Sequence, residues 1–341
     1  MFSNEKKINR LFLYWLIISL ILVYFIIIIG GLTRLTNSGL SITEWELFKG
    51  ILPPLNNISW EIYFDQYKKI PQYKLLNFNM SIDEFKVIFY WEYFHRFLAR
   101  VIGLFFLIPL IYFYFSNKIK KKYINICLIV LLLIIFQGMI GWFMVKSGLV
   151  NDTTVSHYRL SIHLSTAIII ISIIFWLIKN ILSSQNKVFF KFSLKDLPFQ
   201  ILILFVFIQI IIGAFVSGLD AGQIYQTWPL MGNNYFPNDF FFNNYKDIFE
   251  LDNHSLVQFY HRNLAYLLTL YVLSLTIFIY KNKILELYNP LKILIIILFA
   301  QVFLGIFTLI TGLNIYLASM HQLTSVLFVF SALNLYYLRT K

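Results

Sequence analysis

The sequence predicts an all-α integral membrane protein with eight transmembrane helices, built as two tandem four-helix bundles related by a pseudo-twofold axis. Three observations predict this fold class: an apolar composition, eight long apolar runs and an internal repeat. Of the 341 residues, 59% are hydrophobic and 13% are charged, whereas about a quarter of the residues in a soluble domain are charged. We therefore expect lipid to surround most of the chain.

The apolar runs have the length, about 20 residues, that a helix needs to cross a bilayer. We expect the spans at 11–31, 89–115, 124–145, 159–179, 199–217, 257–280, 291–310 and 317–338. The first run is too long for the apolar part of a signal peptide, and no small-residue cleavage site follows it. The single cysteine, Cys127, lies inside an apolar run, so neither an intrachain disulfide nor a thiolate metal site is expected.

The net charge of +12 indicates membrane topology rather than nucleic-acid binding. If the N-terminus lies in the cytoplasm, the inner segments hold 16 of the 28 Lys and Arg residues and three of the 16 acidic ones. This distribution follows the positive-inside rule. We expect a multi-pass protein of a bacterial cytoplasmic (inner) membrane, with both termini in the cytoplasm and no nucleic-acid partner.

The two halves of the chain resemble each other. The matching segments are 29–45 with 212–228, 92–96 with 258–262, 137–141 with 301–305, and 161–167 with 319–325. Because each half holds an even number of spans, the halves share one orientation, as in parallel repeats. We expect two domains, 1–179 and 180–341, each a four-helix bundle of the kind that binds cofactors between facing helices. The long outer segments 32–88 and 218–256 are expected to cover the cofactor sites.

Four histidines occupy matching places near the outer, periplasmic ends of the even-numbered spans. They are His95 and His163 in the first half, and His261 and His321 in the second. A single membrane histidine often only bonds a neighbouring helix, but ionisable groups at this depth are costly and usually functional. Two facing pairs suit two hemes, because each porphyrin leaves only axial positions for the protein to fill. Zinc fits less well, since each pair lacks further ligands.

Three arginines accompany the histidines. Arg96 and Arg262 follow His95 and His261 directly, and Arg159 precedes His163 by four residues. Arginine binds a carboxylate through two parallel hydrogen bonds, so these residues are expected to hold heme propionates. Extension toward lipid headgroups is the alternative, and for Arg159 the two interpretations carry equal weight.

The repeat is broken at one position beside the first histidine. Glu92 precedes His95 by three residues and so shares its helix face, whereas the matching residue of the second half is Gln258. A carboxylate can transfer a proton and an amide cannot. Catalysis is therefore expected in the first half, with Glu92 as the catalytic residue. The alternative is that Glu92 only pairs with Arg96 or Arg100.

The remaining polar residues of the spans and loops are given structural roles. His157 and His254 are interpreted as solvated residues of the outer loops. Gln137, Gln209 and Gln301 lie in odd-numbered spans and are expected to form hydrogen bonds between helices.

A series of longer motifs resembles the heme A synthase family. They include "GGLTRLTNSGLSITEW", "NFNMSIDEFKVIFYWEYFHR", "GWFMVKSGL", "YRLSIHLSTA", "GLDAGQIYQTWPLM", "VQFYHR" and "LASMHQ". Their order is similar to that of the mitochondrial and alphaproteobacterial branch, which lacks the cysteine pair of the first outer loop. Departures are small: Ala99 stands where glycine is usual, and "ITGLNIY" lacks a common proline.

The resemblance implies an oxidoreductase that converts the C8 methyl group of heme O, through the alcohol, to the formyl group of heme A, with oxygen from water, for cytochrome oxidase. It implies that His95, His163, His261 and His321 are heme-iron ligands. It makes the first half, with Glu92, the site of heme O and heme A, and the second half the site of a resident heme b. Heme O synthase and cytochrome oxidase assembly factors become candidate partners, and a homo-oligomer stays open.

Three other functions compete with this one. A diheme b-type electron-transfer protein would not need Glu92. Heme O synthase would need paired acidic motifs for Mg²⁺-diphosphate, which the sequence lacks. A parallel-repeat transporter would use the histidines as a proton relay and would be colourless when purified.

Overall fold

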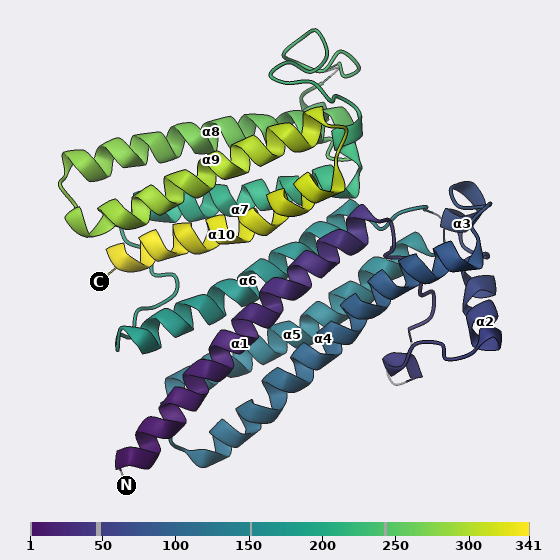
Figure 1. Ribbon diagram of the computed structural model, residues 1–341. Coiled ribbons are helices and arrows are strands. Elements are labelled where there is room, and N and C mark those ends of the chain that lie inside the picture. Colours follow the sequence, from purple (N-terminus) through teal and green to yellow (C-terminus); the bar gives the residue numbers. More distant parts are fainter. Residues whose placement is uncertain (1, 46–48, 151, 242–243, 341) are drawn as a thin grey trace. The chain divides into compact units, whose positions relative to one another are not determined.

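A computed structural model gives the fold of the chain and describes residues 2–45, 49–150, 152–241 and 244–340. Among these residues, eight helices are long and apolar enough to cross a membrane (Figure 1). The prediction of an all-helical protein with eight spans is confirmed. The chain divides into two compact units, Met1–Ile178 and Lys179–Lys341.

The first unit contains four long helices. They are α1 (Phe2–Leu35), α4 (Ile82–Ser116), α5 (Lys121–Gly148) and α6 (His157–Leu182), the last of which runs past the end of the unit. Helix α1 packs on α4, and α4 packs on α5. Aromatic rings join α1 to α4: the Trp15 ring lies 4.7 Å from Phe106 and 5.4 Å from Phe113, and Trp15 Nε1 donates to the Phe105 carbonyl.

Helix α4 begins seven residues before the expected span because its first turn is capped. Ser81 accepts from the Glu84 backbone N–H, and Glu84 accepts in return from the Ser81 backbone N–H. This reciprocal pair is a capping box, which satisfies donors that a helix start would leave open. The first turns of α4 therefore lie before the apolar run, next to the segment that precedes the helix.

The long connection between α1 and α4 contains helices that the sequence analysis did not predict. These are η1 (Lys49–Ile51), α2 (Asn57–Tyr67) and α3 (Pro71–Leu75). Trp60 and Tyr67 of α2 form a buried aromatic cluster with Phe85 and Phe89 of α4. The Trp60 and Phe89 rings are 5.0 Å apart and nearly perpendicular, an arrangement that aromatic pairs favour. The cluster fixes the connection on the first turns of α4.

The second unit holds the other four long helices in a closed ring of contacts. Helices α7 (Leu197–Gly218) and α9 (Tyr288–Ile310) each pack on both α8 (His254–Lys281) and α10 (Ile315–Arg339). The connection from α7 to α8 contains η2 (Ala221–Gln223) and η3 (Tyr245–Phe249), and η4 (Leu285–Leu287) precedes α9. The Trp228–Pro229 peptide bond in this connection is cis.

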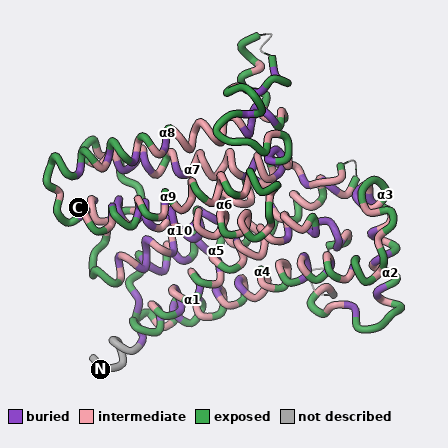
Figure 2. Tube along the Cα trace, turned by 45° about the horizontal axis from the view of Figure 1, so that its top comes forward, coloured by how far each residue is buried: buried purple, intermediate pink, exposed green. Residues whose placement is uncertain are grey.

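The outer faces of the long helices are apolar. Exposed residues, green in Figure 2, recur along the helices of both units, and many are large and apolar, such as Phe115, Leu132 and Ile277. A soluble protein rarely exposes apolar surface so continuously. The surface therefore suits a lipid environment, as expected for a multi-pass membrane protein.

Candidate functional site

Each of the four span histidines lies against a glycine of the preceding long helix. A Cβ atom built on Gly30 would meet His95 Cε1 at 2.9 Å, and one on Gly141 would meet His163 Cε1 at 3.2 Å. Similar Cβ atoms on Gly213 and Gly305 would meet His261 and His321 Cε1, both at 3.1 Å. The imidazoles thus occupy space that only a glycine leaves open. Sequence comparison of the halves could have found this contact, because the glycines recur with the histidines.

The two histidines of the first unit lie close together. The ring centroids of His95, on α4, and His163, on α6, are 6.5 Å apart, and the ring planes cross at 66°. A metal–imidazole nitrogen bond is about 2 Å long, so two rings on opposite sides of one metal ion would have centroids about 6 Å apart. Nδ1 of each ring is buried without a hydrogen-bond partner. The observed spacing therefore fits two imidazoles that bind one metal ion from opposite sides.

The second unit has its own pair, His261 on α8 and His321 on α10. Each ring lies against a glycine of the preceding long helix, and Nδ1 of His321 is buried without a partner. Within the described residues, no group of three or more His, Cys, Asp or Glu side chains could hold a bare metal ion. Pairs of imidazoles suit heme, since the porphyrin supplies the other four nitrogens.

Three glutamines tie the histidine helices to their neighbours. Gln137 Nε2 donates to the His163 carbonyl at 2.8 Å, Gln209 Nε2 to the His261 carbonyl at 3.1 Å, and Gln301 Nε2 to the His321 carbonyl at 2.9 Å. The prediction that these residues form hydrogen bonds between helices is confirmed. Each glutamine precedes its glycine by four residues, so amide and glycine lie on one helix face.

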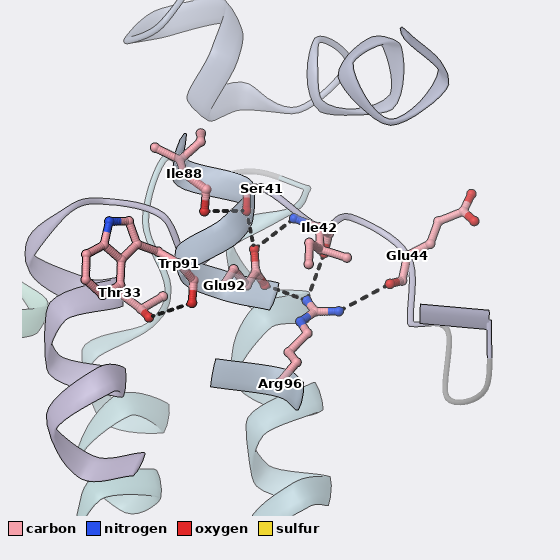
Figure 3. A network of polar contacts seen from close by, with 8 residues as sticks. All are labelled: Thr33, Ser41, Ile42, Glu44, Ile88, Trp91, Glu92 and Arg96. Carbon is pink, nitrogen blue, oxygen red and sulfur yellow. Dashed lines mark hydrogen bonds and ion pairs between the residues drawn. The ribbon is translucent and has the colours of Figure 1, made fainter. Parts of the chain in front are cut away.

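Glu92 is buried at the centre of a polar network in the first unit (Figure 3). Its Oε2 accepts from Ser41 Oγ at 2.7 Å and from the Ile42 backbone N–H at 2.8 Å. Its Oε1 accepts from Arg96 Nη2 at 2.6 Å. The carboxylate therefore fastens the segment after α1 to α4. Sequence reasoning singled out Glu92 and Arg96 but missed Ser41, which no local pattern connects to α4.

Arg96 connects the carboxylate to the same segment. Its guanidinium also donates to the Ile42 carbonyl at 2.8 Å and to the Glu44 carbonyl at 3.3 Å, and it lies over the Trp45 ring, 5.4 Å from the centroid. A hollow beside this network is lined by Arg96 and Arg100 together with aromatic side chains. The structure thus brings Glu92, His95 and Arg96 together on the first half of α4.

The second unit replaces this network with contacts to backbone carbonyls. Gln258 Nε2 donates to the Tyr225 carbonyl at 2.9 Å. Arg262 donates to the Tyr225 and Thr227 carbonyls, both at 2.8 Å. At the position that corresponds to Glu92, the connection after α7 is therefore held on α8 through backbone carbonyls rather than a carboxylate. Glu92 and Gln258 thus both bond the segment that follows the preceding long helix, but Glu92 accepts hydrogen bonds whereas Gln258 donates one.

Asp239 joins two parts of the same connection to the start of α8. Asp239 accepts from Tyr225 Oη at 2.7 Å and from Ser255 Oγ at 2.6 Å. Burial raises the pKa of Asp239, but the hydrogen bonds from Ser255 and Tyr225 outweigh it and leave the pKa below its usual range. A lowered pKa means that the folded loop stabilises the ionised form. The contribution is present above the unfolded pKa and is lost as pH falls through the folded one.

Replacing Asp239 with asparagine is expected to loosen the connection between α7 and α8, because the amide keeps the shape but loses the charge that strengthens both hydrogen bonds. Limited proteolysis should cut residues 219–253 several-fold faster in Asp239→Asn than in the wild type. Acidification should remove this difference, since the wild-type carboxylate is then neutral. Glu250→Gln, an exposed carboxylate in the same segment, is the control. Equal cleavage of all three proteins at neutral pH would contradict the expectation.

The other predicted residues lie apart from these networks or at helix starts. Arg159 donates to the Phe143 carbonyl at 2.6 Å and stacks 3.7 Å from the Phe143 ring centroid, so it packs on α5. The interpretation of His157 as a solvated loop residue is wrong: it is the first residue of α6 and is buried, where its ring packs 4.1 Å from Tyr158. His254 is exposed, as expected, but begins α8.

Comparison with known proteins gives a consistent result. The family model described as cytochrome oxidase assembly protein, COX15-CtaA, matches residues 13–333. The chain is 47% identical to heme A synthase of Pelagibacter ubique over 96% of both chains. It is 42% identical to that of Rickettsia felis, over 92% of this chain and 93% of the relative, and 36% identical to that of Flavobacterium johnsoniae, over 96% and 97%. The chain therefore belongs to the COX15-CtaA family, the family of the heme A synthases.

Proposed function

We propose that this protein is a heme A synthase: a multi-pass membrane oxidoreductase that oxidises the C8 methyl group of heme O to a formyl group. The observation that carries the proposal is the facing pair His95 and His163, 6.5 Å apart, one helical turn from the buried carboxylate of Glu92, in a chain of this family. The first unit takes heme O and releases heme A. The reaction runs through the alcohol, with oxygen from water.

A resident heme b belongs to the second unit, between His261 and His321. The glycine faces and the partnerless Nδ1 of His321 support this assignment. When bound, the heme supplies a route for the electrons released from the substrate. Because Gln258 stands where the first unit has Glu92, the second unit lacks a group that accepts protons at this point.

The residues of the first unit orient the substrate and take up its protons. His95 and His163 hold the substrate iron and thereby fix the height of the porphyrin against α4. Each oxidation round removes two electrons and two protons, and Glu92 receives protons at its carboxylate oxygens. Ser41 Oγ donates to Oε2 and orients that oxygen. Arg96 holds Oε1 and keeps the carboxylate in place between transfers.

The chain is oriented with both termini in the cytoplasm of a bacterial cell, which puts the histidines toward the outer face of the inner membrane. The charge distribution supports this orientation. Heme O synthase and cytochrome oxidase assembly factors are the candidate partners, since they supply the substrate and use the product. The heme propionates have three candidate partners, Arg96, Arg159 and Arg262. Each side chain would have to rotate away from the backbone carbonyl that it now bonds.

Pigment analysis tests the proposal. The chain is produced in a bacterial host that makes heme O but no heme A, and the extracted hemes are separated and weighed. We expect a new heme whose mass corresponds to a formyl group in place of a methyl group. Only heme B and heme O in the extract, with both hemes bound to purified protein, would instead indicate an electron-transfer protein. A colourless protein would favour transport.

A further inference from the structure

The four glycine–histidine contacts define a hairpin that occurs four times in the chain. Its first helix carries the glycine and its second helix carries the histidine: α1 with α4, α5 with α6, α7 with α8, and α9 with α10. In three hairpins a glutamine four residues before the glycine donates to the carbonyl of the histidine. The repeating unit of the site is therefore a glutamine, a glycine and a histidine.

The hairpin of His95 lacks the glutamine. The residue four positions before Gly30 is Ile26, and it is Gln209 that occupies the matching position before Gly213. An isoleucine side chain has no donor for the His95 carbonyl. His95 is thus the one span histidine whose helix is not tied to the glycine helix by an amide.

The ring of His95 is also held less than the ring of its counterpart. Gln209 Nε2 lies 3.1 Å from the His261 carbonyl, 3.2 Å from Nδ1 of its ring and 3.4 Å from Nε2. The amide of Gln209 therefore packs against the His261 ring as well as bonding its backbone. Nδ1 of His95 is buried without a partner, as it is in His163 and His321. Ile26 cannot provide an amide, so packing against Gly30 is what positions the His95 ring.

We propose that Ile26 makes His95 the compliant ligand, through which the first unit exchanges its porphyrin. The proposal rests on the proposed function, because a synthase must release its product while a resident cofactor must stay. In the first unit His163 is tied by Gln137 and holds the iron firmly. His95 yields when heme A leaves and heme O enters. In the second unit both histidines are tied, which retains the heme.

Transfer of hemin to apomyoglobin, a soluble heme acceptor, tests this assignment. The full-length protein is purified in detergent, loaded with hemin and mixed with excess apomyoglobin, and the Soret band is followed. We expect a fast phase from the first unit and a slow phase from the second. His163→Ala identifies the fast phase by removing it.

Ile26→Gln should slow the fast phase roughly three- to tenfold, the effect of one net hydrogen bond, and leave the slow phase unchanged. Gln209→Ile should accelerate the slow phase by a similar factor and leave the fast phase unchanged. Ile26→Leu, which keeps an apolar side chain of the same size, should release hemin as the wild type does. Opposite effects of Ile26→Gln and Gln209→Ile, each confined to one phase, would show that the amide positions the histidine. General loosening of the fold would instead accelerate both phases.

Two results would overturn the proposal. One is an unchanged fast phase in an Ile26→Gln protein that holds both hemins. The other is loss or faster release of hemin from the first unit of that variant, since the new amide would then oppose binding. Failure of the wild-type protein to hold hemin in either unit is a different result, because it would contradict the proposed function itself.

Discussion

Glu92→Gln is expected to stop heme A formation while both units keep their heme. The amide has the shape of the carboxylate but cannot accept a proton. General acid–base groups commonly contribute a factor of about 10²–10⁴ to a rate, so heme A should fall by about that factor. The substitution also places an amide N–H against hydrogen-bond donors, since the carboxylate accepts from Ser41, Ile42 and Arg96.

The measurement combines heme extraction with absorption spectra of the purified variant. Heme O should accumulate in place of heme A, and the spectrum should retain two hemes. Glu84→Gln is the matched control: it is the same substitution in the same helix, at an exposed residue where glutamine also completes a capping box. It should leave heme A formation intact.

Ser41→Ala separates proton transfer from the fastening role of the network. It removes one hydrogen bond to Glu92 Oε2 and keeps the carboxylate, its charge and Arg96. If Glu92 transfers protons, Ser41→Ala should lower heme A formation only several-fold, far less than Glu92→Gln does. Equal losses in both variants, with both hemes bound, would mean that Glu92 acts by holding the outer segment.

The membrane spans were predictable because lipid imposes a strong and local requirement. A run of about 20 apolar residues is sufficient to predict a spanning helix, and the structure has a long helix at every predicted run. The start of α4 was also accessible, since Ser81 and Glu84 have the spacing of a capping box. Helices α2 and α3 were not, because they are short and depend on Trp60 and Tyr67 packing against residues of α4.

The candidate site was predictable in its residues but not in its contacts. Repetition in the two halves singled out the four histidines and the exchange of Glu92 for Gln258. One partner of Glu92 lies 51 positions earlier, at Ser41, and no periodic pattern connects residues so far apart. Arg96 was assigned to propionates from chemistry alone, whereas the structure has it on the Ile42 and Glu44 carbonyls. Tertiary contacts of this kind require coordinates.

Gly30→Ala is expected to abolish heme A formation by displacing His95. The added Cβ would lie 2.9 Å from His95 Cε1, closer than side-chain carbons approach, so the ring or the helix must move. The rings of His95 and His163 are 6.5 Å apart, close to the spacing that a shared iron requires. A displacement of about 1 Å at a reacting site can cost roughly 10²-fold in rate. Loss of the first-unit heme is expected to accompany the loss of turnover.

Two other glycines of the same unit serve as matched controls. Alanine Cβ atoms at Gly103 of α4 and Gly138 of α5 would have no neighbour within 4 Å. Because alanine favours a helix over glycine by about 1 kcal/mol, Gly103→Ala and Gly138→Ala should keep both hemes and full turnover. Gly213→Ala, with its 3.1 Å contact to His261, should instead lose heme from the second unit. A Gly30→Ala protein with the wild-type spectrum and heme A output would show that the His95 ring can move away from the added methyl group. The contact with Gly30 would then not be what positions the ring.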